Sequence, residues 1–258
     1  MQDEQVLGGG NIASVVRVGS TIRRIAGPWS TMVHDHLNHL RSREFELGPR
    51  PYGFDDQGRE ILDYIPGETL VAHPWPQWVY SDAVLIEAVT ALLTYQHCVK
   101  DFRPATVQSR LGTSQMQPEF VVCHNDFAPY NCAFHEGHLV GIYDRDCVWA
   151  ERPEWDLAFA AWHWIPLYAP SDEFEWRTTE DCIRRLELLV TTYGLTVRIG
   201  FIDMILERIN TIRRGILRRA NKGEAAFVKM QDVGHALAMQ NDLDFVREHA
   251  HELSRALS

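Results

Sequence analysis

The stretch VVCHNDFAPYN at residues 121–131 decides the fold, together with LVGIYD at residues 139–144. Each opens on apolar residues, as a buried strand does, and closes on polar ones. The first carries Asp126 and Asn131 in the loop after its strand, and the second ends on Asp144. Together they predict a strand, a loop and a second strand, with two carboxylates and one carboxamide at the mouth of the loop.

These side chains are of the kind that phosphoryl transfer requires. The reaction needs one carboxylate beside the acceptor hydroxyl and hard oxygen ligands for Mg²⁺, because catalysis is mainly positioning and charge neutralisation. Asp126 is the candidate for orienting the hydroxyl, and Asn131 and Asp144 are the candidates for holding the metal. Read alone, however, His124, Asp126 and Asn131 are also ordinary turn residues.

The order of the motifs resembles the aminoglycoside phosphotransferase family, whose relatives include choline kinases and protein kinases. His-x-Asp followed five residues later by Asn is similar to that family's catalytic loop. The segments IYDRD at 142–146 and PEWDLA at 153–158 resemble its metal-binding segment and the Asp-Leu-Ala signature that follows. The resemblance implies that Asp156 braces the catalytic loop through backbone amides and that His124 supports the same loop. It leaves Asp146 either to the acceptor or to a second metal.

Composition bounds the class of protein. The chain has 258 residues, of which 45% are hydrophobic and 23% charged. This composition is typical of a globular protein, and the length is sufficient to bury a substantial core. The net charge of −10 argues against a nucleic-acid partner, which needs clustered Lys and Arg. The start lacks the pattern of a secretory signal, no run is long enough to span a bilayer, and five cysteines show no metal-ligand spacing. We therefore expect a cytoplasmic protein with reduced thiols and no membrane partner.

The first strands are expected to bind nucleotide phosphates. Residues 6–25 read as strands joined by glycine turns, where Gly9 and Gly10 either let backbone amides approach phosphates or form a plain hairpin. In the family that this chain resembles, the third strand carries a basic residue that grips the α- and β-phosphates and pairs with a Glu of the next helix. The alignment gives this role to Arg23, with Arg24 on the opposite side of the strand as the alternative.

The helix expected next departs from the family pattern. It begins near Ser30 or Thr31, either of which is a plausible N-cap, and it runs to Leu40 without a Glu. His34 lies where the partner of the basic residue would be sought. The usual Lys–Glu pair is therefore expected to be absent, so that Arg23 is held by another group or by phosphate alone.

A break after two further strands marks the expected hinge. The strands lie at 49–54 and 59–65, and Pro66-Gly67 ends the second one. The resemblance makes this break the connection between two lobes, where main-chain groups of Asp63 and Ile65 pair with the adenine edge. Beyond it, residues 102–118 look like a loop, because Pro and Gly punctuate them.

The predicted fold class is α+β, a protein-kinase-like bilobal fold. Residues 1–65 form a small, antiparallel, five-stranded nucleotide-binding lobe with one helix, and residues 66–258 form a mainly helical lobe that holds the catalytic loop, the metal site and the acceptor-binding helices. The acidic segment 171–180 is either a solvated helix start or a rim that attracts an ammonium-bearing acceptor.

The resemblance implies an activity as well. It is the transfer of the γ-phosphate of ATP, with Mg²⁺, to a hydroxyl of a small molecule, and the acidic composition favours an amine-bearing acceptor such as an aminoglycoside. The family includes antibiotic-modifying enzymes, so resistance is the biological role implied. The alternative is a catalytically silent kinase-like protein that binds a nucleotide or another ligand, which the missing helix Glu favours. Complete Asp126, Asn131 and Asp144 favour the enzyme.

Overall fold

The computed structural model describes residues 4–7, 15–71 and 74–258. Its contacts divide the chain into two compact units, one of residues 1–79 and 90–156 and the other of residues 80–89 and 157–258. This division differs from the lobe boundary expected after residue 65, which stays a prediction. None of the helices in the described ranges is long and apolar enough to cross a membrane.

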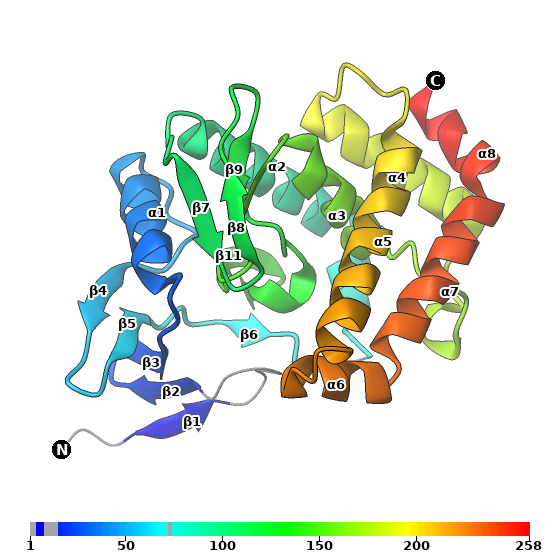
Figure 1. Ribbon diagram of the computed structural model, residues 1–258. Helices are drawn as coiled ribbons and strands as arrows, with labels where there is room; N and C mark the ends of the chain where they lie inside the picture. The colour runs from blue at the N-terminus through cyan, green and yellow to red at the C-terminus, as the bar shows by residue number, and fades with distance from the viewer. Residues whose placement is uncertain (1–3, 8–14, 72–73) are drawn as a thin grey trace. The chain divides into compact units, whose positions relative to one another are not determined.

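The first unit contains an antiparallel sheet of five strands in the order β1-β2-β3-β5-β4 (Figure 1). Alternating apolar residues and a tight turn at Gly19, with φ of 63°, account for its central hairpin. The five strands confirm the expected sheet. Their bounds are β1 (Gln5–Leu7), β2 (Val15–Val18), β3 (Thr21–Ile25), β4 (Pro51–Phe54) and β5 (Arg59–Asp63).

Helix α1 (Ser30–Ser42) is the one helix that follows β3, as expected, and it lies beside the sheet (Figure 1). Val33, Leu37 and Leu40 recur at helical spacing and are buried, because this face packs inward. The expected N-cap is wrong. The cap position is Trp29, which makes no side-chain cap bond, and the Ser30 hydroxyl accepts a hydrogen bond from the Gly27 amide instead.

Short strands after the sheet carry the motif residues. β9 (Val121–Cys123) pairs with β12 (Trp149–Glu151), and β10 (Cys132–His135) pairs with both β11 (His138–Ile142) and β6 (Glu68–Thr69). Gly141 in β11 permits a close approach, since a Cβ there would lie 2.5 Å from Cγ2 of Ile65. The segment after β5 therefore packs directly against the strand that leads to Asp144.

The expectation of a loop at 102–118 is wrong. Residues Thr106–Ser109 and Gly112–Gln115 form the antiparallel hairpin β7–β8, with Val107 opposite Ser114. Val107 is fully buried, and the Ser114 hydroxyl accepts a hydrogen bond from the Ala150 amide of β12 at 2.9 Å. These buried contacts order a segment whose polar composition resembles a loop.

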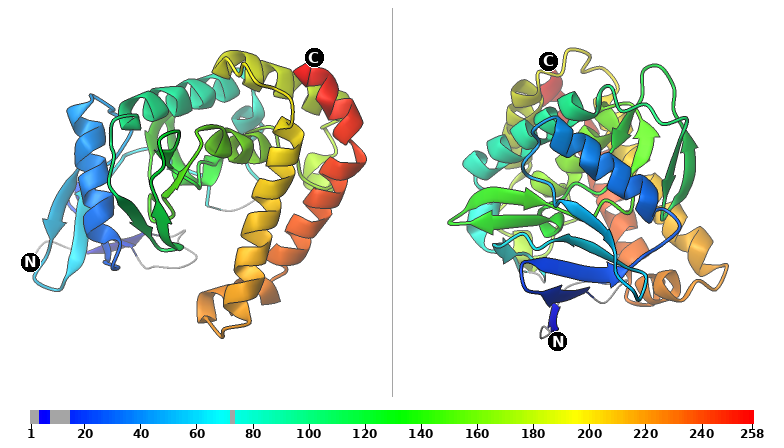
Figure 2. Two further views of the ribbon diagram at one scale, coloured as in Figure 1. Left: turned by 45° about the horizontal axis from the view of Figure 1, so that its top comes forward. Right: turned by 90° about the vertical axis from the view of Figure 1, so that its left-hand side faces the viewer.

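The second unit is helical. Figure 2 shows its long helices α5 and α7 running side by side, with α6 at the bend between them. Thr178 and Asp181 form a capping box at the start of α4, and Gly194 ends it with φ of 71°. The helices of the chain after the sheet are α2 (Asp82–Val99), α3 (Glu154–Trp164), α4 (Thr179–Tyr193), α5 (Phe201–Ala220), α6 (Ala225–Asp232), α7 (His235–Glu248) and α8 (Ala250–Leu253).

Candidate active site

The loop after β9 brings the predicted catalytic side chains together. The Asp126 carboxylate accepts a hydrogen bond from Nδ2 of Asn131 and another from the Tyr130 hydroxyl, each at 2.9 Å. Nδ2 of Asn131 also donates to the Asp126 carbonyl at 2.9 Å. The 3₁₀ turn Pro129–Asn131 makes this approach possible, because it folds the loop back toward its start. Asp126 and Asn131 therefore form one polar pair.

A buried carboxylate braces the start of this loop. Asp156 is completely buried, and its two oxygens accept the amides of His124 and Asn125 at 2.7 Å each. Asp156 stands in the first turn of α3, where the free amides of the helix start also favour a negative charge. These contacts are the ones expected of Asp156, and its part in catalysis stays a prediction.

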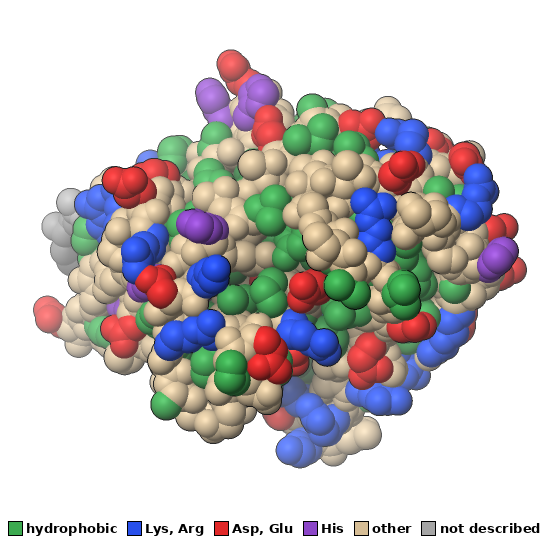
Figure 3. Space-filling view, turned by 90° about the horizontal axis from the view of Figure 1, so that it is seen from above, with side chains coloured by type: hydrophobic (Ala, Val, Ile, Leu, Met, Phe, Trp, Pro, Cys, Tyr) green, Lys and Arg blue, Asp and Glu red, His purple; other side chains and the backbone are tan. Residues whose placement is uncertain are grey.

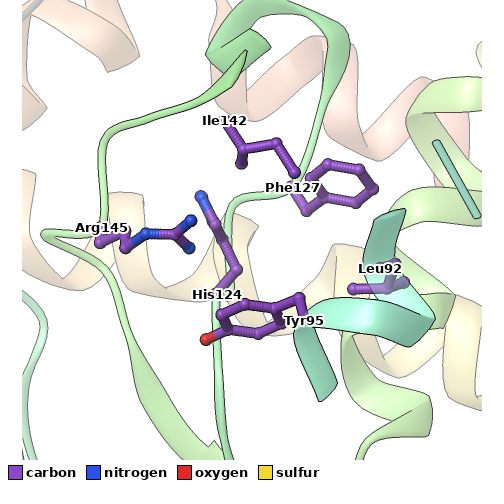
Figure 4. A pocket seen from close by; sticks show the side chains of 6 residues that line it. All are labelled: Leu92, Tyr95, His124, Phe127, Ile142 and Arg145. Atoms are coloured by element: carbon purple, nitrogen blue, oxygen red, sulfur yellow. The ribbon is translucent and has the colours of Figure 1, made fainter. Parts of the chain in front are cut away.

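His124 lies behind the loop in a small enclosed pocket, shown in Figure 4. Burial, and after it the charge of Arg145, lowers the pKa of His124 well below its ordinary value. Its Nε2 lies 3.0 Å from the Tyr143 carbonyl, which can only accept, so the neutral ring donates from Nε2. His124 thereby ties the catalytic loop to the residue before Asp144. The pocket is lined by Leu92, Tyr95, His124, Phe127, Ile142 and Arg145.

Two residues of the site have left-handed backbone conformations, Asn125 with φ of 64° and Asp144 with φ of 56°. Asparagine and aspartate tolerate this region better than most residues. The Asn125 side chain spans the site, since it donates to the Cys147 carbonyl at 2.9 Å and accepts from the Trp155 indole at 3.2 Å. The motif contains Asn125, but its sequence position gave no sign of this bridging role.

Asp144 lies at the end of β11, next to the catalytic loop. The Tyr143 amide donates to the Asn131 carbonyl at 3.0 Å, and 49% of the Asp144 side chain is exposed. Burial, followed by the charges of Asp126 and Asp144, raises the pKa of the Cys147 thiol. Asp126, Asn131 and Asp144 therefore belong to one site.

Asn131 and Asp144 suit a hard cation that takes its remaining ligands from water and phosphate. Within the described ranges, no group of three or more His, Cys, Asp and Glu side chains is arranged to hold a metal ion. A carboxamide oxygen of Asn131 and the exposed Asp144 carboxylate still fit Mg²⁺, which commonly takes one or two protein oxygens and completes its shell with water and phosphate. The partial burial of Asp144 and the charge of Asp146 raise the pKa of the Asp144 carboxyl, while Arg24 opposes them.

The structure brings Arg24, not Arg23, to these carboxylates. Arg24 contacts Asp144 at 3.3 Å and Asp146 at 2.7 Å. Burial alone would lower the pKa of Arg24, but the charges of Asp146, Glu60 and Asp144 outweigh it and raise that pKa. Arg23 faces the other side of β3, where it bonds to Thr21 and its nearest carboxylate, 3.8 Å away, is on the turn after β4. Arg24, predicted from the sequence only as the alternative to Arg23, is thus the arginine beside Asp144 and Asp146.

Glu60 supplies the partner that was sought in the helix. It stands directly opposite Arg24 in the β3–β5 ladder, is 1% exposed, and forms an ion pair with the Arg24 guanidinium. His34 of α1 lies 4.0 Å from Glu60, and burial lowers the pKa of His34 against the opposing charge of that carboxylate. Sequence reasoning missed Glu60 because it looked for an acidic residue on the helix and not on a neighbouring strand.

Asp146 joins two arginines. Its Oδ1 accepts from Arg24 at 2.7 Å and its Oδ2 accepts from Arg110 at 2.6 Å. Sequence reasoning missed Arg110, since the hairpin that carries it was taken for a loop. Both oxygens of Asp146 are engaged by arginines, and 3% of the residue is exposed. The roles predicted for it, toward the acceptor or a second metal, stay predictions.

The remaining predicted nucleotide contacts stay predictions. Gly9 and Gly10 lie outside the described residues. The Asp63 amide donates to the Arg50 carbonyl at 3.0 Å and the Tyr64 amide to the Ser20 carbonyl at 2.9 Å, which fixes the chain just before Ile65. Pairing of main-chain groups of Asp63 and Ile65 with adenine stays a prediction.

The wider surface has mixed charge. On the face shown in Figure 3, Lys and Arg side chains are interspersed with Asp and Glu side chains. The five cysteines are free thiols. The expected absence of nucleic-acid and membrane partners and the expected cytoplasmic location stay predictions.

Comparison with solved structures identifies the fold as that of small-molecule phosphotransferases. The chain is similar to an amicoumacin kinase bound to AMP-PNP and Ca²⁺, with a TM-score of 0.60, 13% identity, and coverage of 93% of this chain and 88% of that one. It is also similar to aminoglycoside 2'-phosphotransferase-IIIa bound to GDP, with a TM-score of 0.59, 12% identity, and coverage of 95% and 93%. It is similar as well to a choline/ethanolamine kinase family protein from Mesorhizobium loti, with a TM-score of 0.52, 15% identity, and coverage of 95% of this chain and 92% of that one.

The fold is therefore kinase-like, as the resemblance to aminoglycoside phosphotransferases and choline kinases predicted. No protein-family model matches the chain. Among curated proteins, it is 29% identical over 217 residues to the trifolitoxin immunity protein of Rhizobium leguminosarum bv. trifolii, with 80% of each chain covered.

Proposed function

We propose that this protein transfers the γ-phosphoryl group of ATP to a hydroxyl of a small molecule. The observation that carries the proposal is the assembly of Asp126, Asn131 and Asp144 at one site beside an ion-paired arginine, Arg24. Asp126 orients the acceptor hydroxyl and accepts its proton. Tyr130 and Asn131 hold that carboxylate in place from two sides.

Asn131 and Asp144 are the residues that would hold Mg²⁺. When bound, the ion supplies charge neutralisation for the phosphates that react. Asp144→Asn is expected to weaken Mg²⁺-nucleotide binding more than it weakens the fold, because half of the Asp144 side chain is exposed. Calorimetric titration with Mg²⁺-ADP, alongside thermal unfolding, checks both parts of this expectation.

Arg24 steadies the inner phosphates of the nucleotide. Glu60 fixes its guanidinium at Nε, which leaves the outer nitrogens directed at Asp144 and Asp146. Gly9 and Gly10 are proposed to cover the phosphates with backbone amides, and the Asp63 carbonyl and Ile65 amide to receive the adenine. Since one of the similar structures binds GDP and another AMP-PNP, titration with both ATP and GTP decides which base is accepted.

A hydroxyl-bearing antimicrobial compound is the proposed acceptor. The similar structures include amicoumacin, aminoglycoside and macrolide phosphotransferases, and the curated relative is an immunity protein. The net charge of −10 attracts an amine-bearing compound such as an aminoglycoside. The acidic segment 171–180 lies in the second unit, and its attraction for an ammonium-bearing acceptor stays a prediction.

The test is nucleotide consumption over a panel of hydroxyl compounds. The purified protein is incubated with Mg²⁺-ATP and aminoglycosides, macrolides or amino alcohols, and both ADP release and the mass of the acceptor are measured. Acceptor-dependent ADP release with a phosphorylated product supports the proposal. Nucleotide binding without consumption on any acceptor would favour a silent binding module. The presence of Glu60 weakens that alternative, since its main motive was the missing acidic partner.

A further inference from the structure

A second arginine stands at the candidate site, on an element that sequence reasoning took for a loop. Arg110 occupies the two-residue connection between β7 and β8, and its amide donates to the Asp146 carbonyl at 2.7 Å. Its guanidinium donates to Oδ2 of Asp146 at 2.6 Å and lies 4.9 Å from the ring centroid of Trp29. Main chain, carboxylate and aromatic ring therefore all hold the Arg110 side chain in place.

The element that carries Arg110 is itself well anchored. Ser109 precedes the connection, is 5% exposed, and its hydroxyl accepts the Leu111 amide at 3.1 Å. On the other strand, Ser114 accepts the Ala150 amide. A long side chain loses less entropy on binding when its backbone and stem are already fixed. The hairpin that carries Arg110 is thus anchored on both of its strands.

Charge also points to a role beyond holding Asp146. The chain has three lysines, at positions 100, 222 and 229. The first follows the last residue of α2 and the others belong to the helical second unit. The described cations beside Asp144 and Asp146 are accordingly arginines, Arg24 and Arg110. Arginine matches phosphate oxygens with its planar fork, and phosphoryl transfer needs cations on both the inner and the outer phosphates.

The two arginines approach Asp146 from different elements. Arg24 comes from β3 and is committed at Nε to the buried Glu60. Arg110 comes from the hairpin and takes the other oxygen of Asp146, two residues beyond the candidate metal ligand Asp144. The two guanidiniums therefore bind different oxygens of one carboxylate.

We propose that Arg110 is a second phosphate-binding cation, which contacts the terminal phosphate of the bound nucleoside triphosphate while Arg24 contacts the inner phosphates. The inference rests on the proposed function. The Arg110 guanidinium donates to a carboxylate oxygen of Asp146, and a phosphate oxygen is an acceptor of the same kind. A residue that only pinned Asp146 would support every nucleotide equally, whereas a residue on the terminal phosphate distinguishes a triphosphate from a diphosphate.

The experiment compares two nucleotides across four proteins. Calorimetric titration, in Mg²⁺, measures the affinities of ADP and of the non-hydrolysable triphosphate AMP-PNP for the full-length wild type, Arg110→Met, Arg110→Lys and Leu111→Ala. Methionine removes the charge but keeps an unbranched chain, and lysine restores the charge without the fork. Leu111 is the matched control, because it is the neighbouring residue of the same connection and is 44% exposed.

Arg110→Met is expected to lower the affinity for AMP-PNP by about tenfold or more, the loss of a charge-assisted contact, and to leave ADP binding unchanged. The affinity of Arg110→Lys for AMP-PNP is expected to lie between those of the wild type and Arg110→Met. Leu111→Ala is expected to bind both nucleotides as the wild type does. Equal losses for both nucleotides, or no loss for AMP-PNP, would overturn the inference and leave Arg110 as a support of Asp146. If Arg110→Met does not fold, the same comparison on Arg110→Lys decides. A wild type that binds neither nucleotide overturns the proposed function, and the inference with it.

Discussion

The two halves of the candidate site are held together in different ways. The half proposed to be catalytic, with Asp126 and Asn131, is closed by hydrogen bonds between residues four and five positions apart. The cationic half joins Arg24 to Glu60 over 36 positions and to Asp146 over 122. The first half follows from local turn geometry. The second exists only when three strands and a hairpin have come together, so the two halves should respond differently to substitution.

The largest effect is expected in the catalytic half. Asp126→Asn should lower turnover about 10²- to 10⁴-fold, because a carboxamide cannot accept the hydroxyl proton. Nucleotide affinity and the thermal unfolding midpoint should change little, since the two groups are almost isosteric. Acceptor-dependent ADP release and calorimetric titration measure the two parts.

Tyr130→Phe is the matched control for that substitution. It removes one hydrogen bond to the Asp126 carboxylate and leaves the base in place, so a smaller loss of turnover is expected. Near-normal turnover by Asp126→Asn on an identified acceptor would contradict the role given to Asp126.

In the cationic half, Arg24 and Arg23 form a natural pair of variants. Arg24→Met should destabilise the fold by about 3–5 kcal/mol, because Glu60 is left buried without its cation. Arg23→Met should cost less than about 1 kcal/mol, because its carboxylate contact is long, at 3.8 Å. Urea unfolding of the two variants measures the difference.

A double variant separates folding from nucleotide binding in this half. Arg24→Met with Glu60→Leu should recover stability, since no unpaired charge remains, yet it should still bind Mg²⁺-ADP weakly. Recovery of nucleotide affinity in the double variant would argue that Arg24 serves the fold alone.

Asp242, a buried carboxylate of the second unit, accepts hydrogen bonds from neutral donors, whereas Glu60 and Asp146 form ion pairs with arginines. Asp242 accepts from the Trp162 indole at 3.0 Å and from the Ala169 amide at 2.7 Å. Burial raises its pKa to about 6, against these donors and Arg177. Because the folded-state pKa lies above the unfolded one, the stabilisation is complete below about pH 4 and is lost as the pH rises through 6.

Asp242 alone should therefore make the protein about 2 kcal/mol more stable at pH 4 than at pH 7. Other carboxylates also titrate in this range, so the measurement is the difference between the wild type and Asp242→Asn in denaturant unfolding across this pH window. Parallel pH profiles of the two proteins would show that the Asp242 carboxyl does not titrate near pH 6 in the folded state.

The smallest effect concerns the strand that leads to Asp144. Gly141→Ala should destabilise the fold by about 1–3 kcal/mol, because the new methyl group meets Ile65 at 2.5 Å. Gly215→Ala in α5 is the control, with no neighbour within 4 Å and an expected gain of up to about 1 kcal/mol. Equal stability of the two variants in urea would mean that the Ile65 segment moves aside without cost.

By itself, the sequence determined the kinase-like fold and the catalytic half of the site. Asp126 and Asn131 lie five positions apart, a distance over which turn chemistry acts. Asp156, whose contacts to the loop span 31 and 32 positions, was predicted from its motif and not from local spacing. The first strands and the helices were predictable for a similar reason, since apolar periodicity is local. The hairpin that carries Arg110 was not, because its short polar strands are ordered by distant partners.

Only the tertiary structure decided which arginine faces the carboxylates and what balances it. A strand places alternate residues on opposite faces, so the choice between Arg23 and Arg24 depends on which face of β3 the rest of the fold covers. The pairing of Arg24 with Glu60, and the meeting of Arg24 with Arg110 on Asp146, follow from strand register and packing between residues far apart in the chain. Local sequence patterns do not predict contacts between residues so far apart in the chain.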